Sequence, residues 1–293
     1  MRPSSTHLSD PPRRVLVIGA TGKTGSRAVR ALDRRGIRVR AASRRSPLPA
    51  ERFDWHDDRT WRPALRDVDA VYVTYQPDLA VPGAADAVGA LAEIAAREGV
   101  TRLVLLSGRG EPAAAAAEAA LLAEAPGATV LRCSWFDQNF SEGALRGAVE
   151  AGALALPAPP DRREPFLDAD DIAECVVAAL TDPSCRGEVV ELTGPESLTM
   201  TQVCGLLAEA AGRPVTYAPR GRDEFARDLA EAGMPAPEAA FLAGLFAEVL
   251  DGRNSATTDG VARLLGRPGR SFAAWAHDAA LAGTWRAPGR APA

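Results

Sequence analysis

The sequence predicts an α/β protein built on a doubly wound parallel sheet of the Rossmann type, with a small, mostly helical C-terminal substrate lobe. Three observations lead to this prediction. Short apolar runs alternate with helical patterns through the first half of the chain, which is typical of a parallel sheet with right-handed crossovers. A glycine-rich turn directly follows the first apolar run, and after residue 150 the alternation gives way to loops and helices.

The predicted strands are short apolar runs bounded by glycine or polar residues, as the buried strands of a parallel sheet are. The first run, "RVLVI", ends directly before Gly19. We expect strands at residues 14–18, 37–45, 51–55, 69–75, 101–108 and 127–135.

Helices are expected between these strands, where apolar residues recur every three or four positions. The first helix stops at Gly36. The third is rich in alanine, which has the highest helix propensity of all residues. The three helices are expected at residues 26–35, 84–97 and 113–125.

The second half of the chain predicts the lobe. One late apolar run, at about residues 188–193, is expected to return to the sheet. Helical patterns cover residues 172–182, 199–212, 223–233 and 237–252. We therefore divide the chain into a loose tail at residues 1–12, a cofactor-binding Rossmann domain at 13–150 and a substrate lobe at 151–293, and expect the substrate pocket in the cleft between the domain and the lobe.

The composition argues against several classes of function. A net charge of −4 and a pI near 5.6 give no basis for binding nucleic acid or an anionic membrane surface. No apolar run reaches the roughly 18 residues of a membrane span. The four cysteines form no CxxC pair and the three histidines are scattered, so we expect no metal site and a place in the reducing cytoplasm. The expected partner is a small-molecule substrate; a homodimer is left open.

The glycine-rich turn, "GATGKTG", allows two interpretations. A phosphate-binding P-loop reads GxxxxGK[ST]. If Gly22, Lys23 and Thr24 ended such a loop, its first glycine would fall on Val17, inside the strand. The spacing therefore favours a dinucleotide site, in which glycines let the backbone approach a pyrophosphate at a helix N-terminus. The expected cofactor contacts are Gly19, Ala20, Thr21, Gly22, Lys23, Thr24 and Gly25.

The end of the second strand indicates which dinucleotide binds. NAD sites carry an acidic residue there, which accepts a hydrogen bond from the ribose 2′-hydroxyl. This chain has Ser43, Arg44 and Arg45 instead. Guanidinium groups bind a 2′-phosphate through charge-assisted hydrogen bonds, and Lys23 adds a further positive charge. The sequence therefore predicts NADPH as the cofactor.

Five segments resemble the NmrA-like branch of the atypical short-chain dehydrogenases/reductases. They are "VLVIGATGKTGSRAV", "ASRRS", "VLLSG", "TVLRCSWFDQNF" and "PFLDADDIAECVVAALTD", and the resemblance covers residues 14–285. The segment "FDWHDDRTW" is similar to the subgroup that includes fungal ergot-alkaloid reductases. The resemblance implies a Rossmann fold, NADPH and the reduction of iminium intermediates.

The chain departs from ordinary short-chain dehydrogenases at their Tyr-xxx-Lys pair, in which tyrosine is the acid/base. Lys23 is the only lysine, so none of the three tyrosines (Tyr72, Tyr75 and Tyr217) is followed by a lysine four residues on. Alanines occupy the helix in which many NmrA-like enzymes keep a lysine, and Cys133 stands where proline is common. Reducing a ketone requires a proton donor for the alkoxide, whereas reducing an iminium requires only hydride.

The positions of polar and aromatic residues after the strands give the remaining site predictions. We expect Tyr75, Ser107 and Asp168 as catalytic candidates, although a structural role suits Asp168 better. Further cofactor contacts are expected at Asp54, Trp55, Thr74, Tyr75, Ser107 and Gly108. The substrate is expected against Ser134, Trp135, Phe136, Asp137 and Asn139, where an aromatic face would attract a cationic heterocycle.

These residues favour an NADPH-dependent reductase of an imine, iminium or hemiaminal carbon in a small secondary metabolite. Two alternatives remain. A redox sensor of the NmrA-like type would bind NADP(H) without turnover, and the missing Tyr-xxx-Lys pair suits it equally. A reductase of quinones or enones would keep the cofactor and change the substrate.

Overall fold

The computed structural model describes residues 11–285, which form two compact units. Unit 1 holds the described residues up to Cys133 together with Ala169–Leu192 and Gly260–Arg267. Unit 2 holds Ser134–Asp168, Thr193–Asp259 and the described residues from Pro268 onward.

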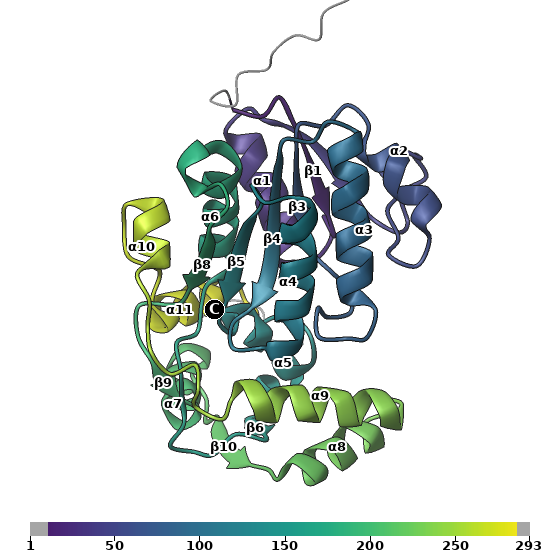
Figure 1. The fold of residues 1–293 in the computed structure, drawn as a ribbon. Coiled ribbons are helices and arrows are strands. Elements are labelled where there is room, and N and C mark those ends of the chain that lie inside the picture. The colour runs from purple at the N-terminus through teal and green to yellow at the C-terminus, as the bar shows by residue number, and fades with distance from the viewer. Residues whose placement is uncertain (1–10, 286–293) are drawn as a thin grey trace, which may run out of the picture. The chain divides into compact units, whose positions relative to one another are not determined.

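Unit 1 contains a parallel sheet of six strands in the order β2-β1-β3-β4-β5-β8 (Figure 1). The strand order reverses between β1 and β3, which makes their carboxyl ends the topological switch point, where ligands of such sheets bind. The strands are β1 (Arg14–Ile18), β2 (Arg38–Ala42), β3 (Ala70–Val73), β4 (Arg102–Gly108), β5 (Thr129–Cys133) and β8 (Val189–Leu192).

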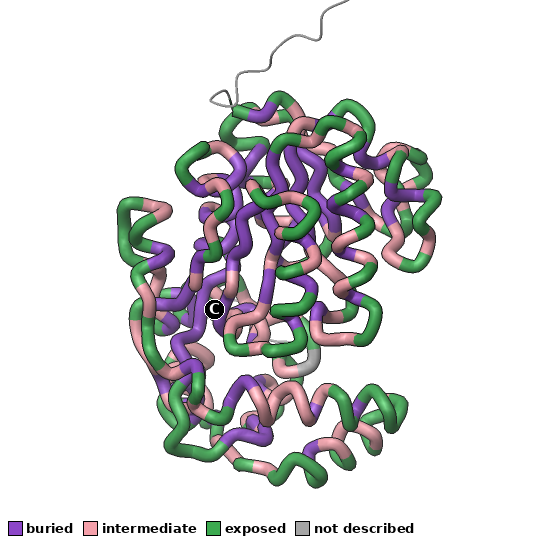
Figure 2. Tube along the Cα trace, in the orientation of Figure 1, coloured by how far each residue is buried: buried purple, intermediate pink, exposed green. Residues whose placement is uncertain are grey.

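Helices cover both faces of this sheet, as its buried apolar strands require (Figure 2). On one face, α1 (Lys23–Arg34) packs against α6 (Ala169–Thr181), and α10 (Gly260–Leu265) packs against α6. On the other, α3 (Ala84–Arg97) packs against α4 (Pro112–Glu124) over an apolar core. The short helices α2 (Trp61–Leu65), η1 (Asp58–Thr60) and η3 (Pro183–Cys185) complete unit 1.

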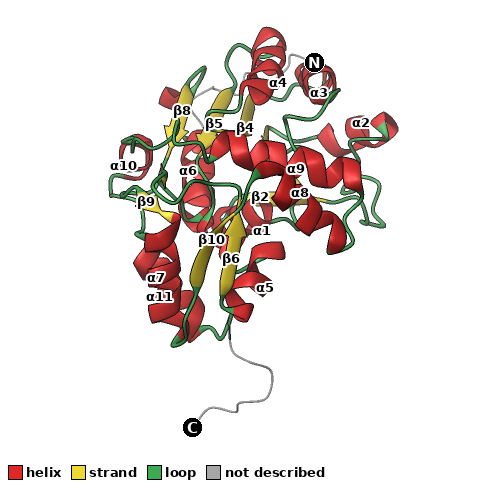
Figure 3. Ribbon diagram, turned by 90° about the horizontal axis from the view of Figure 1, so that it is seen from below, coloured by secondary structure: helices red, strands yellow, loops and turns green. Residues whose placement is uncertain are grey.

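Unit 2 combines helices with two small sheets (Figure 3). Strand β6 (Ala153–Leu156) pairs in parallel with β10 (Thr216–Pro219), and β7 (Arg163–Glu164) pairs antiparallel with β9 (Leu198–Thr199). Phe140, Phe166 and Phe272 meet edge to face in its core. The helices are η2 (Asp137–Phe140), α5 (Ala144–Ala151), α7 (Met200–Ala211), α8 (Arg222–Glu231), α9 (Ala236–Val249) and α11 (Phe272–Leu281).

The predicted Rossmann-type fold is confirmed, but one predicted strand is wrong. Residues 51–55 form only isolated bridges, between Ser43 and Arg52 and between Asp54 and Asp57. The reason is chain length: parallel neighbours need a crossover of about a dozen residues, and residues 43–50 are too few. Both sides of β1 are also already taken, by β2 and β3.

The division into units also differs from the predicted boundary at residue 150. The first segment of unit 1 ends at Cys133, and unit 1 also includes residues 169–192 and 260–267. It does so because β8 pairs with β5, while α6 packs against α1.

Candidate functional site

The turn after β1 has a backbone that only glycine suits. Gly19 adopts a φ of +71°, in the left-handed region that side chains disfavour. A Cβ on Gly19 would also overlap the hydroxyl of Thr74, which donates a hydrogen bond to the carbonyl oxygen of Ile18 at 2.9 Å. Thr74, the residue after β3, thus stabilises the turn after β1, at the switch point of the sheet.

The start of α1 closes tightly over the same turn. The backbone N–H of Gly22 donates to the carbonyl oxygen of Gly19 at 2.8 Å, and Gly22 is the N-cap of α1 without a side-chain cap. A Cβ on Gly25 would overlap the Gly19 carbonyl. The glycines therefore leave an open cradle of backbone N–H groups at a helix N-terminus, which fits the pyrophosphate of a dinucleotide. Lys23 is the first residue of α1, and Ala20, Thr21 and Thr24 complete the loop.

The arginines predicted to favour NADPH over NADH follow directly after β2. The backbone of Ser43 is held by two hydrogen bonds, since its N–H donates to the carbonyl oxygen of Glu51 and its carbonyl oxygen accepts from the backbone N–H of Phe53. Arg44 and Arg45 are exposed, and their side chains form no hydrogen bond or ion pair with any described residue. Both guanidinium groups are therefore available to an anion.

An aromatic cluster lies beside the switch point and joins two of the predicted segments. Trp55 packs against Tyr75 with ring centroids 4.7 Å apart and against Trp61 at 5.5 Å. Its indole N–H donates to the carbonyl oxygen of Thr74 at 3.0 Å. Trp55 and Tyr75 remain partly exposed. Asp54 is held in a turn, its carboxylate accepting from the backbone N–H of His56.

Ser107, predicted at the nicotinamide end, has a buried hydroxyl that is already engaged. It donates to Glu118 of α4 at 2.5 Å. Arg132, the neighbour of Ser107 on β5, holds the same carboxylate through its Nε at 3.0 Å and its Nη2 at 2.6 Å. This contact raises the pKa of Arg132. Sequence reasoning missed Glu118 and Arg132; the available signal was an acidic residue within a run of alanines.

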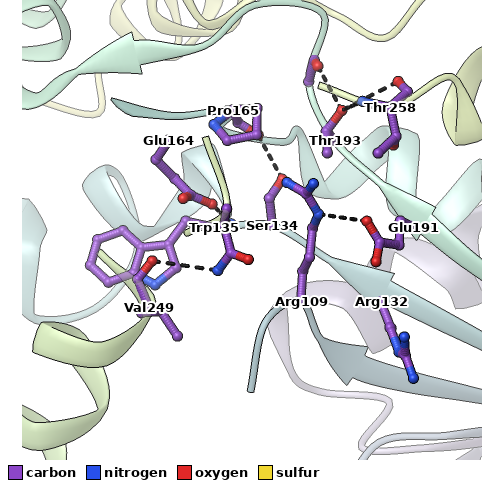
Figure 4. A network of polar contacts seen from close by, with 12 residues as sticks. Arg109, Arg132, Ser134, Trp135, Glu164, Pro165, Glu191, Thr193, Val249 and Thr258 are labelled. Carbon is purple, nitrogen blue, oxygen red and sulfur yellow. Dashed lines mark hydrogen bonds and ion pairs between the residues drawn. The ribbon is translucent and has the colours of Figure 1, made fainter. Parts of the chain in front are cut away.

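A second ion pair follows in the same unit. Arg109, directly after β4, places its Nε 2.8 Å from Glu191 of β8 (Figure 4). The backbone N–H of Arg109 donates to the carbonyl oxygen of Cys133, which continues the pairing of β4 with β5. Gly108, the other residue predicted there, ends β4.

Asp168 lies in unit 2 and is only 1% exposed. Its carboxylate accepts from the side-chain amide of Gln138 at 2.7 Å and from Arg270 at 3.1 Å. The predicted catalytic role therefore has little structural support, because both oxygens are occupied inside the unit.

The residues predicted to bind the substrate follow β5 and also belong to unit 2. Ser134 is buried and donates to the carbonyl oxygen of Pro165 at 2.6 Å (Figure 4), and Asp137 is fully buried. Trp135 and Phe136 are half-buried. Trp135 meets Phe246 of α9 edge to face at 4.8 Å. Asn139 is half-buried in η2.

The described part of the chain offers few residues for a metal site or for a reactive thiol. No cluster of three or more His, Cys, Asp or Glu side chains within residues 11–285 could hold a metal ion. The four cysteines are unpaired and buried, and burial raises the pKa of the Cys204 thiol to about 11. No described helix combines the length and the apolar character that crossing a membrane requires.

Comparison with known proteins agrees with this geometry. The NAD(P)H-binding family model matches residues 19–183, and the NmrA-like family model matches residues 127–249. The chain is 33% identical over 279 residues to the uncharacterized oxidoreductase YesF of Bacillus subtilis (strain 168), covering 92% of this chain and 96% of that one. It is 33% identical over 286 residues to agroclavine dehydrogenase of Claviceps fusiformis, covering 90% and 96%.

A solved structure gives the same fold. The NADPH-dependent quinone oxidoreductase of Escherichia coli, in complex with NADPH, superposes with a TM-score of 0.73 at 20% identity and covers 90% of this chain and 99% of that one. At this identity the likeness concerns the fold alone. The family models and the two relatives carry the assignment further: this chain belongs to the NmrA-like family and is an NAD(P)H-dependent oxidoreductase.

Proposed function

We propose that this protein is an NADPH-dependent reductase that delivers hydride to an imine, iminium or hemiaminal carbon of a small, alkaloid-like secondary metabolite. The observation that carries the proposal is the state of Ser107, whose one hydroxyl proton is donated to Glu118. Because the chain also lacks a Tyr-xxx-Lys pair, no residue at the end of β4 is arranged to protonate an alkoxide.

A cationic C=N carbon suits such a site. Bound NADPH supplies a hydride. As the C=N carbon gains its new bond, the electron pair of the C=N bond moves to nitrogen, and the product is a neutral amine. No proton has to be delivered. A hemiaminal gives the same cation when its hydroxyl group takes up a proton from solvent and leaves as water, and an imine gives it by taking up a proton from solvent, whereas a ketone would give an alkoxide that requires a donor.

The preference for NADPH is supported by charge. Arg44 and Arg45 extend from the end of β2, where an NAD site carries an acidic residue. Two guanidinium groups would favour a 2′-phosphate through charge-assisted hydrogen bonds. We assign Lys23 to the phosphates. Trp55 and Tyr75 would form a partly exposed aromatic surface for the adenine, so we propose a binding role for Tyr75 instead of acid catalysis.

The proposed substrate class is supported by two half-buried aromatic side chains and by similarity to a known enzyme. Trp135 and Phe136 are half-buried aromatic residues, and aromatic faces attract organic cations. Agroclavine dehydrogenase, an enzyme named for an alkaloid, is 33% identical to this chain. Because Ser134 and Asp137 are buried, we propose that they shape the segment that presents Trp135.

The test is a screen for NADPH oxidation, which is measured as the loss of the near-ultraviolet absorbance of NADPH. Cyclic imines, iminium salts, hemiaminals and quinones are compared, with NADH as the control cofactor. Turnover confined to the C=N compounds supports the proposal. Turnover confined to quinones keeps the reductase and refutes the substrate class.

A second candidate function rests on the same missing proton donor. A redox sensor binds NADP(H) and reports its oxidation state to a partner without turnover. Tight binding of NADPH with no turnover on any compound, together with a clear difference in affinity between NADPH and NADP⁺, would favour the sensor.

A further inference from the structure

Tyr72 of β3 carries a hydroxyl group that is buried without a hydrogen bond. The side chain has no exposed surface, and its oxygen forms a hydrogen bond with no described residue. A buried hydroxyl without a partner is costly, because water can no longer solvate it. Native proteins contain few such groups, and a partner that arrives with a ligand is one explanation for them.

The strand directs Tyr72 toward the helix that follows the glycine-rich turn. Its neighbours Val71 and Val73 belong to the apolar core that α3 and α4 cover. Because side chains alternate along a strand, Tyr72 lies on the opposite face of the sheet, which α1 and α6 cover. Thr74, two residues further along, contacts the turn itself at Gly19. Tyr72 therefore extends beneath the helix side of the predicted phosphate site.

Thr24 is the polar residue that this hydroxyl approaches. Thr24 is the second residue of α1, directly after Lys23, and it is only 5% exposed. Burial raises the pKa of Tyr72 well above its usual range, and the side chain of Thr24 opposes that effect only in part. The two hydroxyls thus lie near one another at the N-terminus of α1 without a well-formed hydrogen bond, and Tyr72 keeps its proton.

The N-terminus of α1 is also where the turn leaves backbone N–H groups for a pyrophosphate. The helix has 12 residues, and no side chain caps it at Gly22. Such a terminus attracts anions through its N–H groups and its dipole. A threonine hydroxyl in the first turn adds one donor, and it has a single proton. Once Thr24 donates that proton to an anion, its oxygen still accepts a hydrogen bond from Tyr72.

We propose that Tyr72 is a positioning residue for the phosphates of the cofactor and acts through Thr24. When the cofactor is bound, the Tyr72 hydroxyl donates to the Thr24 hydroxyl, which donates to a phosphate oxygen. Each proton stays on its own oxygen. Hydrogen bonds in a chain polarise one another, so Tyr72 strengthens the bond from Thr24 to the anion. This inference rests on the phosphate position in the proposed function and concerns cofactor binding alone.

The test compares stability with affinity, because the two should change in opposite directions. Tyr72→Phe removes the buried hydroxyl and keeps the ring. In the full-length protein without cofactor, it should raise the thermal midpoint by about 2 °C or more, since an unpartnered buried group is lost. It should nevertheless raise the Kd for NADPH roughly threefold to tenfold, the effect of one hydrogen bond. Thermal unfolding and fluorescence titration measure the two quantities.

Two further variants separate the proposed role from a structural one. Tyr217→Phe is the matched control, because the Tyr217 hydroxyl already donates to the carbonyl oxygen of Ala158 in unit 2. It should lower the thermal midpoint and leave the Kd for NADPH unchanged. Thr24→Val removes the hydroxyl between Tyr72 and the phosphate. It should raise this Kd, and adding Tyr72→Phe to Thr24→Val should raise it no further.

Three results would overturn the inference. The first is an unchanged Kd for NADPH in Tyr72→Phe, or no binding of NADPH by the wild-type protein. The second is a joint loss of stability and affinity in Tyr72→Phe, which would make the tyrosine a structural residue. The third is independent, additive losses of affinity in Tyr72→Phe and Thr24→Val.

Turnover distinguishes this inference from the proposed function. If the wild-type protein reduces no C=N compound while its Kd for NADPH depends on Tyr72 through Thr24, the proposed function fails and the positioning role stands. If iminium salts are reduced and Tyr72→Phe leaves the Kd for NADPH unchanged, the reductase stands and Tyr72 does not position the phosphates.

Discussion

Replacing Gly25 by alanine tests the phosphate cradle directly. The new Cβ would lie 2.8 Å from the carbonyl carbon of Gly19 and 3.1 Å from the Cα of Ala20, whereas carbon atoms normally pack at about 3.5–4.0 Å. The obstacle is backbone, which cannot rotate away as a side chain can. The turn must therefore move by several tenths of an ångström, and the N–H groups that we expect to bind the pyrophosphate move with it.

The expected loss follows from those N–H groups. A hydrogen bond to a charged group contributes about 1.5–3 kcal/mol, so misplacing even one lowers the affinity for NADPH roughly tenfold to a hundredfold. Fluorescence titration with NADPH measures this loss. Gly205→Ala in α7 is the matched control, because a Cβ there meets nothing within 4 Å. It should keep the wild-type affinity and stabilise the fold by about 0.5–1 kcal/mol.

One outcome would refute the reasoning. If Gly25→Ala binds NADPH as tightly as the wild-type protein while its thermal midpoint is unchanged, the turn after β1 is not the pyrophosphate site. An equal loss of affinity in Gly205→Ala would show that the effect is not local to the turn.

Three further predictions follow from named side chains. Arg44→Asp should raise the Kd for NADPH at least tenfold and leave the Kd for NADH unchanged; Arg30→Asp, an exposed change on α1, is the control, and equal losses for both cofactors would contradict the placing of the 2′-phosphate. Ser107→Ala should leave kcat on an iminium salt within about threefold, because its hydroxyl proton is committed to Glu118, and a loss above a hundredfold would make that hydroxyl catalytic. The free energy of unfolding should fall as pH rises from about 9 toward 11, because the folded state keeps a proton on the Cys204 thiol that the unfolded chain releases. Urea titrations at several pH values measure this dependence, and Cys204→Ala should make it weaker. The same pH dependence in the variant and the wild-type protein would contradict the role of Cys204.

Local patterns predicted the sheet well because its central strands, such as β1 and β3, are short apolar runs that are buried on both faces. The spacing of Gly19, Gly22 and Gly25 was sufficient to predict a tight glycine turn, since close backbone contacts leave no room for side chains there. The binding of a pyrophosphate by this turn stays a prediction. The error at residues 51–55 arose because an apolar run alone does not reveal whether a neighbouring strand is free to pair.

Local sequence patterns could not predict which charged residues of the site pair with one another. Glu118 and Arg132 are 14 positions apart and meet only because α4 packs beside β5, so their ion pair depends on tertiary structure. Ser107 was placed correctly at its strand end, but the direction of its hydroxyl depends on Glu118.

The interrupted path of the chain through unit 1 has a consequence for biosynthesis. A ribosome that has released residues up to Cys133 has supplied five of the six strands, but β5 still has a bare edge until residues 189–192 emerge. Unpaired strand edges recruit other chains, so the nascent protein passes through an aggregation-prone interval. A truncated product ending near residue 150 would be trapped there, and its solubility during expression should be far lower than that of the full chain.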